Sequence, residues 1–411
     1  MSPPLADVRV LDLSRILAGP LAGQYLADLG ADVVKVERPG TGDDTRGWAP
    51  PYAVEPSDGD PGLAAYYMCA NRGKRSIAID ITKPEGAALV RKLAKWADVV
   101  LENFKVGGLA KYGLDYESLS EVNPSLIYCS ITGFGQDGPY AKRAGYDFLV
   151  QAMGGFMSVT GTPDGSPGAG PMKAGVAISD QMSGMNALTA ILAALYRRAK
   201  TGEGARIDVA LLDCTVSTLA NQATSYLASG VPPGRLGNAH PTVVPYEAFA
   251  TQDGHIVLAV GNDGQFARFC EVAGKPELAE DSKYRTNAAR IINRGELIPQ
   301  IAHIMATRTS ADWMTSLEQA AVPCGPINTI DHVFADPQIK HRAMRRTLEH
   351  ANHGPLDVVA NPIRFADHDT TNHRPPPRLG QDTVDVLRRE LGYDEAQINE
   401  LLQTGIIEAR S

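Results

Sequence analysis

Two hydrophobic patterns alternate along the first third of the chain. Residues 8–13 form a β-branched apolar run, residues 21–29 place apolar side chains at helical spacing, and residues 31–36 form a second apolar run. A strand, a helix and a strand within about 30 residues make a βαβ unit, in which the two strands are parallel. The same alternation continues over 76–80, 84–96, 98–102 and 126–131. We therefore predict a doubly wound α/β domain built on a parallel sheet.

The length of the chain favours a second domain. At 411 residues it exceeds the size at which one hydrophobic core stops growing. Residues 246–260 form two apolar runs around Asp253-Gly254, which predicts a β-hairpin, and helical patterns follow. We predict a large Rossmann-like domain over residues 1–200, completed by residues from about 330 to 411. A linker helix over 201–230 then leads to a small α+β domain over 231–328.

Charge and cysteine content limit the class of protein. The formal net charge is −8, which argues against nucleic acid as the main partner. The 5 cysteines are widely spaced without a CxxC pair, so neither a disulfide framework nor a zinc site is expected. The chain lacks both a secretory pattern and the roughly 18 uncharged apolar residues that a membrane span needs. We expect a cytoplasmic protein without membrane contact.

Several catalytic and cofactor motifs are missing from the sequence. There is no Walker A motif, no GxGxxG after the first strand, no HExxH pair and no GxSxG elbow. An NTPase, a nicotinamide dehydrogenase and an α/β-hydrolase are therefore not supported, and we expect no metal.

Asp180 is the sharpest catalytic candidate. It ends a short apolar run, residues 173–179, at the start of a strong helical pattern. An aspartate there suits a helix N-cap, which accepts hydrogen bonds from free backbone N–H groups. The same place also keeps a carboxylate ionised and directed, so that it can attack a carbonyl and carry an acyl group. The residues alone leave both interpretations open.

Cations and polar residues lie where predicted strands meet their loops. Arg38 follows the second strand, the cluster Asn71–Ser76 precedes another, and Glu102-Asn103-Phe104 ends a third. Ligands of doubly wound sheets bind outside the carboxyl ends of the strands, and guanidinium groups match phosphate geometry. A phosphate-bearing ligand is the functional interpretation, and solvated surface charge with core packing is the alternative.

Taken together, these segments resemble the class III coenzyme A transferases over nearly the whole chain. The matching segments are Leu11–Pro20, Gly30–Gly40, Asn71–Ser76, Glu102–Phe104, Gly113–Tyr116, Asn123–Pro124, Ser130–Gly135, Gly145–Asp147 and Gly175–Asp180. Each is weak alone, and their common order and spacing make the resemblance specific.

The resemblance implies a function for individual residues. Asp180 matches the aspartate that forms acyl-anhydride and aspartyl-CoA thioester intermediates in the family. Coenzyme A would be a substrate, with no permanently bound cofactor and no metal. The residues that match or adjoin CoA-binding positions are Arg38, Arg72, Lys74, Arg75, Asn103 and Phe104. Backbone N–H groups near Leu17 and Ala18, or in the loop 237–241, are expected beside the reacting carbonyl, and Tyr146 beside the acyl group. The family also implies an interlocked homodimer.

Two differences between this sequence and the formyl-CoA transferases indicate the class of substrate. Leu17 replaces the glutamine of formyl-CoA transferases, and Gly237–Pro241, which contains His240, replaces their glycine run. These features resemble transferases of the succinyl-CoA–glutarate type, so we expect succinyl-CoA as donor and a dicarboxylic acid as acceptor. A distal carboxylate needs a cation, for which Arg46 and Arg143 are the candidates, and surface charge is the alternative for both.

Two other functions remain as alternatives. The first is an α-methylacyl-CoA racemase, which pairs its aspartate with a histidine where this chain has Tyr146, and tyrosine is a poor base at neutral pH. The second is a non-catalytic CoA-binding protein, against which the intact segment around Asp180 argues.

Overall fold

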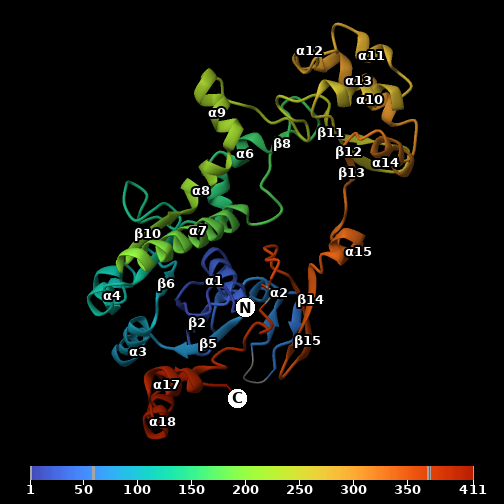
Figure 1. The fold of residues 1–411 in the computed structure, drawn as a ribbon. Coiled ribbons are helices and arrows are strands. Elements are labelled where there is room, and N and C mark those ends of the chain that lie inside the picture. The colour runs from blue at the N-terminus through green and yellow to red at the C-terminus, as the bar shows by residue number, and fades with distance from the viewer. Residues whose placement is uncertain (1, 58–60, 368–369, 371, 411) are drawn as a thin grey trace. The chain divides into compact units, whose positions relative to one another are not determined.

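The computed structural model describes residues 2–57, 61–367, 370 and 372–410 (Figure 1). Its contacts divide the chain into two compact units. The first comprises Met1–Met157, Lys173–Val231 and Gln338–Ser411, and the second comprises Ser158–Met172 and Pro232–Pro337. We expected the segment Ser158–Met172 in the large domain, whereas its contacts place it in the second unit. Within the described residues, no helix is both long and apolar enough to cross a membrane.

A seven-stranded sheet forms the centre of the first unit, in the order β10-β7-β6-β1-β2-β5-β16. The strands are β1 (Arg9–Asp12), β2 (Asp32–Glu37), β5 (Lys74–Ile79), β6 (Val99–Glu102), β7 (Ile127–Thr132), β10 (Ala205–Ala210) and β16 (Ile407–Glu408). All neighbours are parallel except β16, which runs antiparallel to β5. The predicted large parallel-sheet domain is thus confirmed. The strand order reverses between β1 and β6, and doubly wound sheets bind ligands at such a point.

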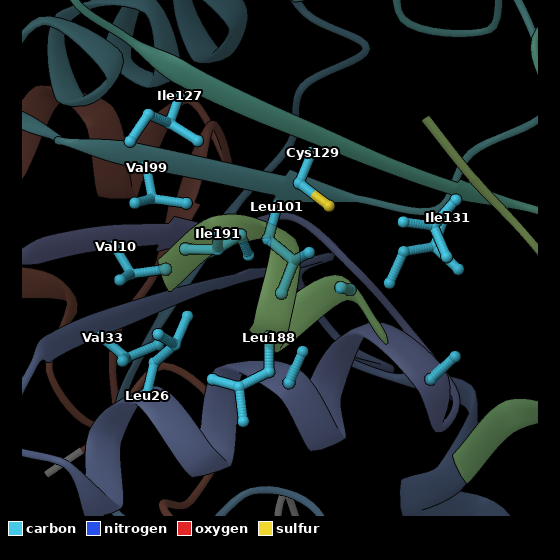
Figure 2. Close-up of a cluster of buried hydrophobic side chains, with 14 of the residues drawn as sticks. Val10, Leu26, Val33, Val99, Leu101, Ile127, Cys129, Ile131, Leu188 and Ile191 are labelled. Carbon is cyan, nitrogen blue, oxygen red and sulfur yellow. The ribbon is translucent and has the colours of Figure 1, made fainter. Parts of the chain in front are cut away.

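Helices cover both faces of this sheet (Figure 1). One face packs against α1 (Ala18–Asp28) and α7 (Ile178–Thr201). The other packs against α3 (Pro84–Trp96), α4 (Tyr116–Val122), α17 (Thr383–Leu391) and α18 (Glu395–Gln403). Figure 2 shows the first core, where strand residues such as Val10 and Val99 meet Leu26 of α1 and Leu188 of α7. Each fully buried aliphatic side chain of this kind stabilises the fold by about 1.5–3 kcal/mol.

Helix α1 begins three residues earlier than the hydrophobic spacing predicted. Pro20 lies in its first turn, where the missing N–H breaks no intrahelical hydrogen bond. Gly19 allows close packing there, because a Cβ atom would lie 2.3 Å from the Ser14 Cβ atom. The helix therefore starts immediately after the loop that follows β1.

Some elements were not predicted. A hairpin of β14 (Arg345–His350) and β15 (Gly354–Val359) packs on Tyr67 and Leu63. The linker helix expected over 201–230 is instead strand β10 followed by two helices, α8 (Leu211–Thr218) and α9 (Ala220–Ser229), which meet at Ala220 with a φ of 44°.

The second unit has its own core. An antiparallel sheet of β11 (Tyr246–Ala250), β12 (His255–Ala259) and β13 (Cys324–Pro326) packs with α10 (Asp263–Val272), α13 (Arg294–Met305) and α14 (Ser310–Gln319). Trp313 is buried at its centre and donates a hydrogen bond from Nε1 to the Met305 carbonyl at 2.8 Å. The segment Ser158–Met172 contributes a small ribbon of β8 (Gly161–Thr162) and β9 (Gly170–Pro171).

Candidate active site

Two adjoining cavities lie at the carboxyl edge of the parallel sheet. The larger, of ≈ 540 Å³, is lined by the loops after β1, β6 and β7, by residues 145–147 and by Asp180. The smaller, of ≈ 220 Å³, is lined by residues that end or follow β2 and β5, including Arg38 and Thr82. Both are lined by Arg15, Asp44, Phe104 and Tyr112. The site is therefore elongated and lies where the strand order reverses.

Asp180 is the third residue of α7, after Ser179, and its helix is capped by another residue. Asp147 Oδ1 accepts hydrogen bonds from the backbone N–H groups of Ser179 at 2.8 Å and Asp180 at 3.3 Å. The N-cap residue of α7 is Ala177, which has no capping side chain. Across the described residues, no group hydrogen-bonds the Asp180 carboxylate, which lines the larger cavity. The N-cap interpretation of Asp180 is therefore wrong.

The electrostatic surroundings make Asp180 unusually basic. Burial raises the pKa of its carboxyl to about 7, and the negative charge of Asp147 adds to the rise. The ionised form is thus a better nucleophile than an ordinary aspartate.

The loop after β1 carries Leu17 and Ala18 into the larger cavity. Within it, Ile16 has a φ of 73°, a left-handed conformation that costs a β-branched residue about 1–3 kcal/mol. Buried groups hold this conformation. The Ile16 N–H donates to Asp43 Oδ1 at 3.2 Å, and Lys35 Nζ donates to the Ser14 carbonyl at 2.8 Å.

Asn103 and Phe104 connect the loops on the two sides of the strand-order reversal. Asn103 accepts a hydrogen bond from the Arg15 N–H at 2.8 Å and donates one to the Arg15 carbonyl at 2.6 Å. The Phe104 N–H donates to Glu102 Oε2 at 2.7 Å, and its ring lies 5.6 Å from the Arg15 guanidinium carbon. Burial raises the pKa of Glu102 to about 7.

A model of one protein family, described as CoA-transferase family III, matches residues 5–383. The chain belongs to this family. It is therefore an enzyme that transfers coenzyme A, as the resemblance predicted.

Relatives and solved structures agree with this family assignment. The transferase is 54% identical to the succinate–glutarate CoA-transferase of Agrobacterium fabrum, over 94% of this chain and 95% of that protein. It is 43% identical to the succinyl-CoA:glutarate CoA-transferase of Homo sapiens, over 98% and 90%. A CAIB/BAIF family protein from Brucella suis has a similar fold, with a TM-score of 0.84, 49% identity and coverage of 95% and 100%.

Three cations that we expected to bind coenzyme A have internal partners in the transferase. Arg72 pairs with Asp28 at 2.5 Å, and Lys74 pairs with Asp12 at 2.9 Å. Arg75 pairs with Asp32 and Glu390, at 2.5 Å and 3.1 Å. All three cations are buried and line neither cavity. Each of these cations thus has a carboxylate partner within the fold, while Arg72 also lines a further cavity of ≈ 420 Å³ beside Leu17. Their role in CoA binding stays a prediction.

Arg46 is likewise held inside the fold, and its role towards the substrate stays a prediction. It donates two hydrogen bonds to Glu37, at 2.8 Å and 2.7 Å, and its guanidinium carbon lies 3.8 Å from the centre of the Tyr67 ring. It is 1% exposed, so it does not reach the larger cavity that Asp180 lines.

The other expected residues line the cavities, with one exception. Arg38 is exposed in the smaller cavity, and Tyr146 and Arg143 are exposed in the larger one. Arg143 lies over the rings of Phe134 and Tyr140 and forms no ion pair with a carboxylate of the described residues. The exception is His240, which belongs to the second unit, where it accepts a hydrogen bond from the Thr242 N–H.

Five charged residues that line the larger cavity were not proposed from the sequence: Arg15, Asp44, Lys105, Lys111 and Asp147. Arg15 and Lys105 follow the carboxyl ends of β1 and β6, so the rule that identified Arg38 could have found them. Asp147 lies in the matching segment Gly145–Asp147, which could have pointed to it, whereas the place of Lys111 in the site depends on tertiary packing.

Proposed function

We propose that this transferase moves CoA from succinyl-CoA to a dicarboxylic acid, with Asp180 as the covalent acyl carrier. Two relatives are named as succinate–glutarate and succinyl-CoA:glutarate CoA-transferases, which supports succinyl-CoA as the donor and a dicarboxylic acid as the acceptor. The observation that carries the mechanism is that the Asp180 carboxylate has no competing hydrogen bond and lines the cavity at the strand-order reversal.

We place coenzyme A as an elongated ligand along the two adjoining cavities. In the proposed pose, Arg38 and Arg15 face its phosphates, which guanidinium groups bind well. Phe104 lies between the cavities and contacts the pantetheine arm, and Asn103 fixes the Arg15 loop. Lys105 and Lys111 add positive charge to the larger cavity.

The chemistry requires four steps at Asp180. Its carboxylate attacks the donor thioester, the carbon–sulfur bond breaks, and a mixed anhydride and CoA thiolate form. The thiolate attacks the aspartyl carbonyl and releases the donor acid, leaving an aspartyl thioester. The acceptor carboxylate attacks this thioester to give a second anhydride, and the thiolate then takes the acceptor acyl group. One thioester replaces another, so no ATP is consumed.

Each attack develops an oxyanion that needs preorganised donors. Backbone N–H groups near Leu17 and Ala18, at the start of α1, are the proposed donors, and the Tyr146 hydroxyl is a further one. Arg143 is the proposed partner of the acceptor's distal carboxylate, since its charge is not neutralised by a carboxylate. A homodimer with interlocked chains and a cytoplasmic location remain predictions.

The test is CoA transfer from succinyl-CoA to a panel of mono- and dicarboxylic acids. We expect turnover with dicarboxylates such as glutarate, and none for Asp180→Ala with native folding. Deuterium exchange at the α-carbon of a branched acyl-CoA, without transfer to any acid, would instead identify a racemase.

A further inference from the structure

The start of α7 leaves backbone donors that some acceptor must satisfy. The first four N–H groups of a helix have no intrahelical partner. Ala177 supplies no capping side chain, and Asp147 Oδ1 accepts from both Ser179 and Asp180. Asp147 is the first residue of α5 (Asp147–Met153). The acceptor for these two N–H groups therefore comes from another helix and not from a side chain of α7 itself.

We propose that Asp147 is a positioning residue for the reaction: by accepting the free N–H groups at the start of α7, it keeps the Asp180 carboxylate unbonded and facing the larger cavity. This inference rests on the proposed role of Asp180. Without Asp147, these N–H groups would be left free beside the Asp180 carboxylate, and a carboxylate at the third helical position can reach back to bond the N–H of the cap.

A buried glutamine fixes the orientation of Asp147. Gln151 Nε2 donates to Asp147 Oδ2 at 2.6 Å, and Gln151 Oε1 accepts from the Ala174 N–H at 2.9 Å. Gln151 is 0% exposed, so reversing its amide would leave both bonds unmade. Asp147 therefore accepts three hydrogen bonds and donates none, which is the pattern of a carboxylate.

Two glycines place this carboxylate next to the end of β7. A Cβ atom on Gly133 would lie 2.5 Å from the Gly145 Cα atom, so the two backbones meet where no side chain fits. This contact holds the segment that leads into Asp147 against the loop after β7. The position of Asp147 is therefore set by the backbone as well as by Gln151.

The charge of Asp147 also favours acylation of Asp180. Two carboxylates close together repel each other, and the repulsion ends when Asp180 becomes a neutral anhydride or thioester. The other ionisable side chains around Asp180 are Tyr66, whose pKa the Asp180 charge helps to raise, and those that line the same cavity: Arg15, Asp44, Lys105, Lys111, Tyr112, Arg143 and Tyr146. Asp147 is the one charged group that contacts the Asp180 backbone directly among the described residues.

The test compares Asp147→Asn with wild type over pH 5.5–9, using kcat/KM for succinyl-CoA. We expect kcat to fall at least about tenfold, and the acidic limb of kcat/KM to move about one pH unit lower, because a like charge has been removed. A purely structural role would lower the rate without moving the limb. An unmoved limb, or an unchanged kcat, overturns the proposal.

Two further variants keep the test decisive. The double variant Asp147→Asn/Gln151→Glu exchanges the carboxylate and the amide. The carboxylate at position 151 accepts hydrogen bonds from the amide at position 147 and from the Ala174 N–H, so both bonds are restored while the negative charge moves to position 151. We expect recovery of thermal stability over the single variant, with the limb still displaced. If the single variant does not fold, the pH dependence of kcat/KM of the double variant decides.

The control variant is Asp137→Asn, which removes an exposed charge and should leave kcat and the acidic limb of kcat/KM unchanged. If wild type transfers no CoA, the proposed function fails, whereas normal transfer with an unmoved limb refutes only the role of Asp147.

Discussion

Replacing Asp180 by asparagine should stabilise the protein, and increasingly so as the pH rises. The pKa of the Asp180 carboxyl is raised from the usual 3.8 to about 7. Between these values the folded chain holds a proton that the unfolded chain has released, so the stability of wild type falls as pH rises through this window and levels off above pH 7. Asparagine is neutral at every pH, so the variant does not lose stability as the pH rises through this window.

The structure sets the size of this effect. Roughly three pH units at about 1.4 kcal/mol each give an upper bound of about 4 kcal/mol. Asp180 is only half-buried at an open cavity, so solvent screening reduces this to about 2 kcal/mol above pH 7. The stability difference between Asp180→Asn and wild type should be about 1 kcal/mol larger at pH 8 than at pH 5.

Urea unfolding followed by circular dichroism at pH 5, 6, 7 and 8 measures this difference. pH-independent effects of the substitution cancel when the two proteins are compared across pH. A difference that is constant, or that shrinks as pH rises, would refute the claim that burial and Asp147 raise the pKa of Asp180.

Two further predictions test the remaining assignments. Arg143→Met should raise KM about tenfold for glutarate and little for butyrate, with Lys142→Met as the matched control; equal effects on both acids would remove Arg143 from recognition of the distal carboxylate. Lys74→Met should lower the free energy of unfolding by about 3–5 kcal/mol, because it leaves Asp12 as a buried charge without its ion-pair partner. Native stability with a raised KM for succinyl-CoA would instead support a role of Lys74 in CoA binding.

Local patterns predicted the fold where hydrophobic periodicity was strong. Helix α3 has the predicted bounds, Pro84–Trp96, because Pro84 begins it and its apolar spacing is regular. The hairpin of β14 and β15 was missed because charged and polar residues interrupt its apolar ones. The break at Ala220 carries no proline or glycine that could have marked it.

The site was predictable only in part, because residue type does not show which partner a charge will find. Asp180 was found through its neighbouring sequence. Arg72 and Lys74 looked like phosphate ligands, yet Asp28 and Asp12 neutralise them from positions far away in the chain. Asp147 lies in a segment that matches the family, but its hydrogen bonds could not be predicted because they depend on a close approach of α5 and α7.

The fate of one oxygen atom tests the central claim most directly. In the proposed sequence the acceptor acid supplies the bridging oxygen of the second anhydride, and this oxygen stays on Asp180 when the thiolate removes the acyl group. After a single turnover of succinyl-CoA with glutarate labelled with ¹⁸O in its carboxylates, mass spectrometry of the digested enzyme should find one heavy oxygen in the Asp180 side chain. A second heavy oxygen should appear after further turnovers. Turnover without label there, or with label on another residue, would contradict the account.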